Sequence, residues 1–87
     1  MTDEQRRALQ RLLAISGAKA RTAMDLRAMG VDDIVRASGL ARSTVYDFLA
    51  GSGSPRLITL VGIAAALEVD PRALLPTLKE LRAHDPR

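Results

Sequence analysis

Residues 54–69, SPRLITLVGIAAALEV, are almost wholly apolar after their first three positions. Ser54 is a typical N-cap residue, and Pro55 suits the first helical position because proline loses no hydrogen bond there. Apolar residues then recur at helical spacing, as one main stripe and two further residues that widen it. They are Leu57, Leu60, Val61, Ala64 and Leu67, with Ile58 and Ile63 beside them. A helix that is apolar nearly all round is predicted to be the buried centre of its domain.

The chain has 87 residues, of which 47% are hydrophobic but only 2% aromatic. This length predicts one domain, near the lower end of what can bury a core unaided, with a core of aliphatic residues. The absence of cysteine excludes disulfides, thiolate metal sites and cysteine nucleophiles. No apolar run approaches the roughly 20 residues that cross a bilayer, and the start MTDEQRR does not resemble a signal peptide. We therefore expect a cytoplasmic protein without membrane contact, in which the single histidine, His84, is solvated in a polar tail.

Helical patterns run along the rest of the chain, and no segment has a convincing strand pattern. A first helix is predicted from Thr2 or Asp3 to about Ile15, and Gly17 is expected to end or kink it. Further helical segments are predicted over 18–29, 31–38, 42–50 and 54–69, and after the Asp70–Pro71 pair. Pro76 makes the last segment either a kinked helix or two short ones. The predicted fold class is all-α, with five or six helices.

The segment VDDIVRASGLARSTVYDFL, residues 31–49, pairs two short helices around Gly39. Val45 and Phe48 of the second helix are predicted to face inward. A glycine lets the chain turn sharply and present the second helix outward, which is typical of a helix-turn-helix. The first turn of that helix can then reach base edges in the major groove of DNA. The alternative is a plain helical hairpin with a solvated outer face.

From about Leu26 to Leu75 the chain resembles the phage-repressor and Cro type of helix-turn-helix domain, the lambda-repressor-like family. Three features carry the resemblance: ASGLARSTV through the turn and second helix, Gly51 at the end of that helix, and SPRLITLVGIAAALEVDPRALL for the fourth and fifth helices. It implies a DNA-binding domain of five to six helices, here with an extra N-terminal helix. The base contacts that it implies are Arg42, Ser43, Thr44, Tyr46 and Asp47. The contacts with the DNA backbone that it implies are Ala41, Ser52, Ser54 and Arg56.

The chain departs from the family pattern at two positions, and Asp32, Asp33 and Asp47 also place negative charge near the expected DNA contacts. Val31 stands where these repressors often place a phosphate-binding glutamine, and Ala41 replaces the usual Ser or Thr cap. Three roles are open for Asp47: accepting from cytosine N4, pairing with Arg42, or remaining solvated. Tyr46 is expected to be exposed, either contacting a phosphate or a thymine methyl or covering the edge of the hairpin.

Residues 1–17 are predicted to form a basic amphipathic helix ahead of a helix-turn-helix domain spanning 18–84. Residues 1–29 hold six basic and three acidic side chains, a difference equal to the +3 net charge of the whole chain. The arginines of this helix lie opposite its leucines: Arg6, Arg7 and Arg11 against Leu9, Leu12 and Leu13. The helix could pack on its own domain, join two subunits, or lay its arginines along phosphates.

We interpret the chain as a sequence-specific DNA-binding transcriptional regulator, a dimeric repressor that binds a palindromic operator through helix 42–50. The expected dimer contacts are Leu74, Leu78 and Leu81, whose alternative role is to close the protomer core. The expected partners are double-stranded DNA, a second copy of the chain and a regulatory partner protein. No catalytic group, metal or cofactor is expected, and hence no enzymatic activity. The rival interpretation is a protein-interaction module, an antitoxin or an adaptor, which the equal number of acidic and basic residues in 30–56 favours.

Overall fold

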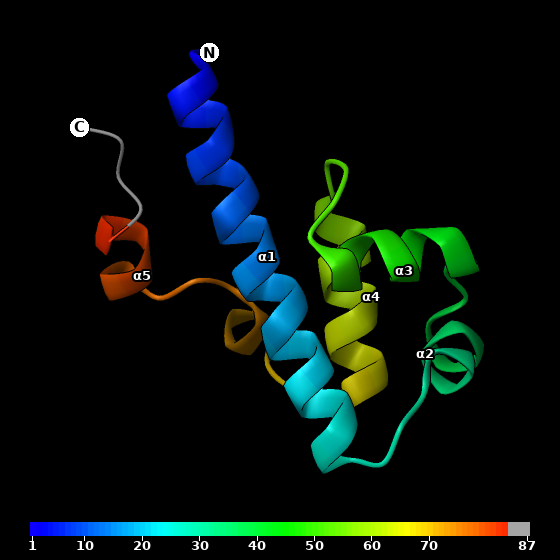
Figure 1. Cartoon of the computed structure of the whole chain (residues 1–87). Helices are drawn as coiled ribbons and strands as arrows, with labels where there is room; N and C mark the ends of the chain where they lie inside the picture. Colours follow the sequence, from blue (N-terminus) through cyan, green and yellow to red (C-terminus); the bar gives the residue numbers. More distant parts are fainter. Residues whose placement is uncertain (84–87) are drawn as a thin grey trace.

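A computed structural model describes residues 1–83, and over this range the chain contains helices but no strands. The all-α prediction is therefore confirmed for the described residues. His84, and with it the predicted end of the helix-turn-helix domain, lies outside them. Within residues 1–83, five α-helices and one short 3-10 helix follow one another: α1 (Asp3–Leu26), α2 (Val31–Ser38), α3 (Arg42–Ala50), α4 (Leu57–Leu67), η1 (Pro71–Leu74) and α5 (Leu78–Ala83) (Figure 1).

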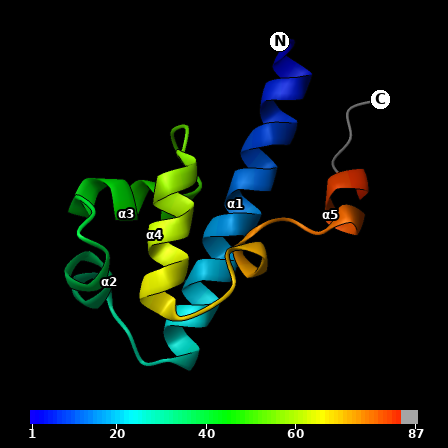
Figure 2. The ribbon, with the colours of Figure 1, turned by 180° about the vertical axis from the view of Figure 1, so that it is seen from behind.

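The longest helix, α1, runs between the group α2–α4 on one side and the segment with η1 and α5 on the other (Figures 1 and 2). Its C-terminal half packs against α3, α4 and η1, while its first turn extends beyond them (Figures 1 and 2). A helix of 24 residues is about 36 Å long, close to the 40 Å long axis of the molecule. Thr2 caps its start in a capping box, in which Thr2 Oγ1 accepts from the backbone N–H of Gln5 at 3.1 Å.

The prediction that Gly17 ends or kinks the first helix is wrong, because α1 runs without a break to Leu26. Gly17 instead lies where the C-terminal end of α3 crosses α1. A Cβ atom there would stand 2.5 Å from the carbonyl oxygen of Leu49 and 2.8 Å from that of Phe48. Gly51, which ends α3 at φ +70°, approaches the backbone of Ala14 equally closely. The glycine at position 17 therefore permits a close helix crossing, and the boundary predicted after residue 17 lies inside a continuous helix.

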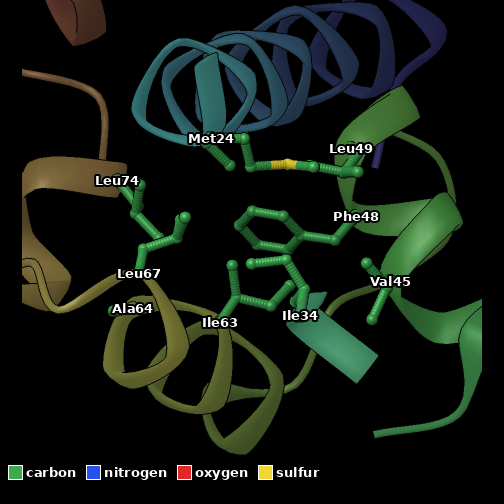
Figure 3. Packing of buried hydrophobic residues seen from close by; sticks show 10 residues of the cluster. Met24, Ile34, Val45, Phe48, Leu49, Ile63, Ala64, Leu67 and Leu74 are labelled. Carbon is green, nitrogen blue, oxygen red and sulfur yellow. The ribbon is translucent and has the colours of Figure 1, made fainter. Parts of the chain in front are cut away.

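The hydrophobic core lies between α1, the α2–α3 pair, α4 and η1. Phe48 occupies its middle, with Met24 of α1 on one side and Ile63 of α4 on the other (Figure 3). Leu74 of η1 closes the core and is only 1% exposed. The prediction that Phe48 is a core residue is confirmed, and aliphatic residues supply the rest of the cluster apart from Met24.

Helix α4 begins later and is less buried than its sequence predicts. Its N-cap is Arg56, not Ser54, so Pro55 precedes the helix by two residues. The residues that α4 buries lie on one face: Thr59, Ile63, Ala64 and Leu67. Leu57, Ile58 and Val61 are exposed, because α1, α2, α3 and η1 cover the helix only on its inner side. Of the predicted main stripe, Leu60, Ala64 and Leu67 pack in or against the core, whereas Leu57 and Val61 do not.

Pro76 separates two short helices, which confirms one of the two alternatives for the last segment. Asp70 caps η1 by accepting from the backbone N–H of Arg72 at 2.9 Å. Helix α5 is attached to α1 through Lys19, whose Nζ donates to Glu80 Oε1 at 2.7 Å and to the carbonyl oxygen of Leu75 at 2.9 Å. Hydrogen bonds from Lys19 and from the Thr77 backbone lower the pKa of Glu80 to about 2, so this carboxylate is ionised at neutral pH.

The crossing of α1 and α3 predicts that Gly17→Ala destabilises the fold. Glycine-to-alanine changes inside helices ordinarily stabilise by roughly 0.5–1 kcal/mol, but the contact with the α3 carbonyls should reverse the sign and cost ~1–3 kcal/mol. The control is Gly62→Ala in α4, where the added Cβ would meet only the flexible tip of Leu40, at 3.3 Å. Urea denaturation of both variants measures the difference, and equal stability of the two would contradict a tight crossing.

Candidate nucleic-acid interface

Helices α2 and α3 form a helix-turn-helix whose turn depends on Gly39. This residue ends α2 in the left-handed region, at φ +73°, and its N–H donates to the carbonyl of Val35 at 2.9 Å. Leu40 then packs against the core before α3 begins at Arg42. Because Val45 and Phe48 are buried, the opposite face of α3 is turned outward. The predicted helix 42–50 and its inward face are thereby confirmed.

The outward face of α3 carries the predicted base-contacting side chains. Thr44 is half-buried and the others are exposed: Arg42, Ser43, Tyr46 and Asp47. The exposure predicted for Tyr46 is confirmed, at 52%. Ala41 occupies the N-cap and its side chain makes no capping hydrogen bond, so amide groups of the first turn of α3 are left without the usual side-chain acceptor.

A groove of about 400 Å³ separates α3 from the start of α4. Thr44 and Asp47 line it from α3, and Ser52, Ser54 and Arg56 line it from the connection to α4. Ser52 is held against the end of α3, since its N–H donates to the carbonyl of Asp47 at 2.9 Å. The fold thus brings residues predicted to contact bases and residues predicted to contact the DNA backbone around one depression.

Arg42 forms an ion pair with Asp32 in the first turn of α2, where Arg42 Nη1 donates to Asp32 Oδ1. Hydrogen bonding and charge from Asp32 raise the pKa of Arg42 above its ordinary value, and Tyr46 contributes in the same direction. The sequence indicates Asp47 as one partner for this arginine and gives no sign of Asp32. Ten residues separate the pair, so only the crossing of α2 and α3, and no helical periodicity, could have revealed it.

Three basic side chains of α1 lie on its N-terminal half. Arg6, Arg7 and Arg11 are exposed, and Arg6 Nη1 lies 3.9 Å from Asp3 Oδ1 within the same helix. This end of α1 and the connection between α3 and α4 lie toward the same end of the molecule in both views (Figures 1 and 2). The three arginines are nevertheless on a separate element from the helix-turn-helix.

The leucines predicted to form a dimer contact differ in their exposure. Leu74 belongs to the protomer's own core, so it offers no surface to a second copy. Leu78 and Leu81 of α5 are 62% and 44% exposed. Leu57 and Leu75 are exposed as well, and both line a cavity of about 160 Å³ beside α1.

Residues 1–83 offer neither a metal cluster nor a membrane span. No group of three or more His, Cys, Asp or Glu side chains in this range is placed to hold a metal ion. Within the same residues, no helix has the length and apolar character needed to cross a membrane.

Comparison with known proteins identifies a structural relative. The chain is similar to the crystal structure of the restriction-modification controller protein C.AhdI from Aeromonas hydrophila, with a TM-score of 0.68 and 27% sequence identity. The match covers 72% of this chain and 96% of that chain. No protein-family model and no curated protein matches the sequence. The match confirms the lambda-repressor-like helix-turn-helix fold and agrees with the prediction that the chain is not an enzyme.

Proposed function

We propose that this chain, a helix-turn-helix domain of the phage-repressor type, is a sequence-specific transcriptional regulator that reads DNA through α3. The observation that carries the proposal is the outward face of α3, where polar and charged side chains stand on a helix that the core fixes in place. The major groove is wide enough to admit such a helix. The structural relative is a controller protein of a restriction-modification system, which supports a regulatory role.

The first turn of α3 is proposed to read bases. Arg42 can bridge O6 and N7 of guanine, which is the commonest specific contact in the major groove. Ser43 and Thr44 can contact bases or phosphates, and Tyr46 is exposed enough to reach a thymine methyl or a phosphate. Asp47 is proposed to accept from cytosine N4, since its carboxylate is exposed on the same face and Asp32 takes the pairing with Arg42.

Contacts with the DNA backbone are proposed at the two helix starts that border the groove. Ala41 leaves amide groups of α3 uncapped, and Arg56 likewise makes no side-chain cap at α4. Amide groups at a helix N-terminus favour an anion such as phosphate. Ser54 supplies a hydroxyl donor beside them, on the connection between the two helices. Ser52 lies on the same connection, and its hydroxyl, which donates to the Asp47 carbonyl at 3.3 Å, would exchange that bond for one to phosphate.

We further propose a homodimer that represses transcription from a palindromic operator in the cytoplasm. One short recognition helix reads only a few base pairs, and repressors of this kind gain selectivity by pairing two half-sites about one helical turn apart. Leu78 and Leu81 are the exposed apolar side chains proposed to hold the two copies together. A partner protein could then regulate the dimer.

One observation favours the rival function of a protein-interaction module. Residues 30–56 carry three basic and three acidic side chains, and Arg42 is already paired with Asp32. A module that binds only protein would show no preference for any DNA sequence, so a measured preference for one duplex over another separates the two functions.

Arg42→Ala is expected to weaken binding to the preferred DNA sequence by roughly 5- to 100-fold, because one bidentate guanine contact is lost. Binding to unrelated DNA should change much less. Fluorescence anisotropy with both duplexes measures the ratio of the two affinities. Arg56→Ala is the control, since losing a phosphate contact should weaken both modes alike. An unchanged ratio in Arg42→Ala would mean that α3 is not the recognition helix.

If Arg6, Arg7 and Arg11 contact phosphates, replacing all three by glutamine should flatten the dependence of log affinity on log salt. Each lost phosphate contact reduces the magnitude of this negative slope by about 0.9. Glutamine preserves helix propensity, so circular dichroism should show an intact α1. The control is Arg72→Gln on η1, whose guanidinium pairs with Asp70 at 2.9 Å. A slope equal to that of the wild type would mean that α1 does not contact phosphates and serves in packing or in subunit contact.

Leu78→Glu together with Leu81→Glu is expected to give a folded monomer that binds a half-site but has lost cooperative binding to a full palindrome. Two charges placed in an apolar contact oppose association. Sedimentation velocity measures the mass of the particle at tens of micromolar. The matched control is Leu26→Glu, a leucine that is 83% exposed at the C-terminal end of α1. A wild type that stays monomeric, even on the palindrome, would refute the dimer.

A further inference from the structure

The ion pair between Arg42 and Asp32 joins the first turns of two neighbouring helices. Arg42 Nη1 donates to Asp32 Oδ1, and the two side chains remain 54% and 70% exposed. The arginine that is proposed to read a base therefore has a fixed carboxylate beside it before DNA arrives. The pair lies at the surface that α3 would present to the major groove.

We propose that Asp32 is a specificity-determining residue, which orients the Arg42 guanidinium toward a guanine and opposes its capture by phosphate. The inference rests on the proposed function of α3 as the recognition helix. Asp32 acts through Arg42, so it is a positioning residue for the base contact.

Rigid packing holds Asp32 where this role requires it. Ile34 of α2 and Val45 of α3 are both fully buried in the shared core, so the two helix starts cannot move apart without disturbing it. The neighbouring Asp33 is engaged elsewhere, accepting from the N–H of Gly30 at 2.8 Å. The Asp32 carboxylate is therefore the one that faces α3. An ion pair anchored on two packed helices loses less side-chain entropy than one between flexible segments.

The guanidinium group retains the capacity to read a base while it is paired. It has five N–H donors in a planar fork, and Asp32 occupies Nη1. A guanine offers two neutral acceptors, O6 and N7, whereas a phosphate carries a full negative charge. The charge of Asp32 repels an approaching phosphate more strongly than it disfavours a guanine edge. The carboxylate should therefore lower non-specific affinity and raise the contribution of the guanine contact.

Tyr46 lies on the same side of α3, one turn after Arg42. Asp32 raises the pKa of Arg42 above its ordinary value, and Tyr46 contributes in the same direction. The guanidinium is held by the carboxylate of Asp32 on the neighbouring helix. This arrangement restricts the rotamers of a long side chain, which reduces the entropy lost when the base contact forms.

The test compares four forms of the full chain: wild type, Asp32→Asn, Arg42→Ala and the double variant. Each is selected against a pool of randomised duplex DNA, and affinities for the enriched sequence and for unrelated DNA are then measured. Asp32→Asn is expected to raise affinity for unrelated DNA by about two- to fivefold, the effect of removing one exposed charge. It should lower the ratio of specific to non-specific affinity roughly five- to tenfold and relax the same guanine position as Arg42→Ala.

In the Arg42→Ala background, adding Asp32→Asn should leave that ratio unchanged, because Asp32 would have no guanidinium to orient. The matched control is Glu68→Gln at the far end of α4. It also removes one carboxylate from an exposed pair with arginine, at 3.0 Å from Arg27 Nη1, and should alter neither affinity ratio nor sequence preference. Asp32→Ser replaces Asp32→Asn if circular dichroism shows that the latter is unfolded.

Three outcomes are distinguishable. A wild type that enriches no sequence refutes the proposed function itself. A wild type whose preferred guanine depends on Arg42 but not on Asp32 overturns the inference and leaves the function standing. Equal gains of affinity for both kinds of DNA in Asp32→Asn also overturn it, because Asp32 would then only repel DNA.

Discussion

The close crossing of α1 and α3 determines how the recognition helix is presented. At Gly17 and Gly51 the two backbones approach so closely that neither position has room for a Cβ atom. The guanidinium of Arg21 on α1 donates to the carbonyl oxygen of Leu49 near the end of α3, which joins the helices again one turn later. Since Phe48 also fills the core between α1 and α4 (Figure 3), α3 is fixed from its C-terminal end. The first turn of α3 lies at the opposite end of the helix from these contacts and is exposed to solvent.

The charges around that first turn nearly balance one another. Asp32 and Asp33 lie in the first turn of α2, where their negative charges interact favourably with the helix dipole. Asp32 also pairs with Arg42. Few positive charges are therefore available on the helix-turn-helix for non-specific attraction to DNA. In a regulator of this kind, the net positive charge of α1 would supply that attraction, while α2 and α3 would supply discrimination. The two contributions come from different segments of the chain.

The sequence predicted the helix-turn-helix well because local signals and burial agree there. Gly39 and Gly51 both adopt the left-handed conformation that helix ends prefer, and Phe48 is the aromatic residue of the core. The sequence failed at Gly17 because a helix-interior glycine looks like a helix end when the crossing helix is unknown. It failed at α4 because apolar periodicity does not reveal which faces other helices cover, and so Leu57 and Ile58 were assigned to the core. The Arg42–Asp32 contact was missed for the same reason: it depends on the angle between two helices.

Helix α5 is attached to the rest of the molecule by the Lys19 ammonium group rather than by buried side chains, since none of its residues is buried. The pKa of Glu80, lowered to about 2 from 4.5, means that the pair is intact above the ordinary pKa and is lost only as the pH falls toward 2. Protons therefore do not control this attachment near neutrality, but dissolved ions do, because they screen a partly exposed pair. If α5 joins two subunits, raising the ionic strength would weaken two equilibria: the binding of the protein to DNA phosphates and the association of the two subunits. The slope of log affinity against log salt for operator binding would then be steeper than the phosphate contacts alone explain.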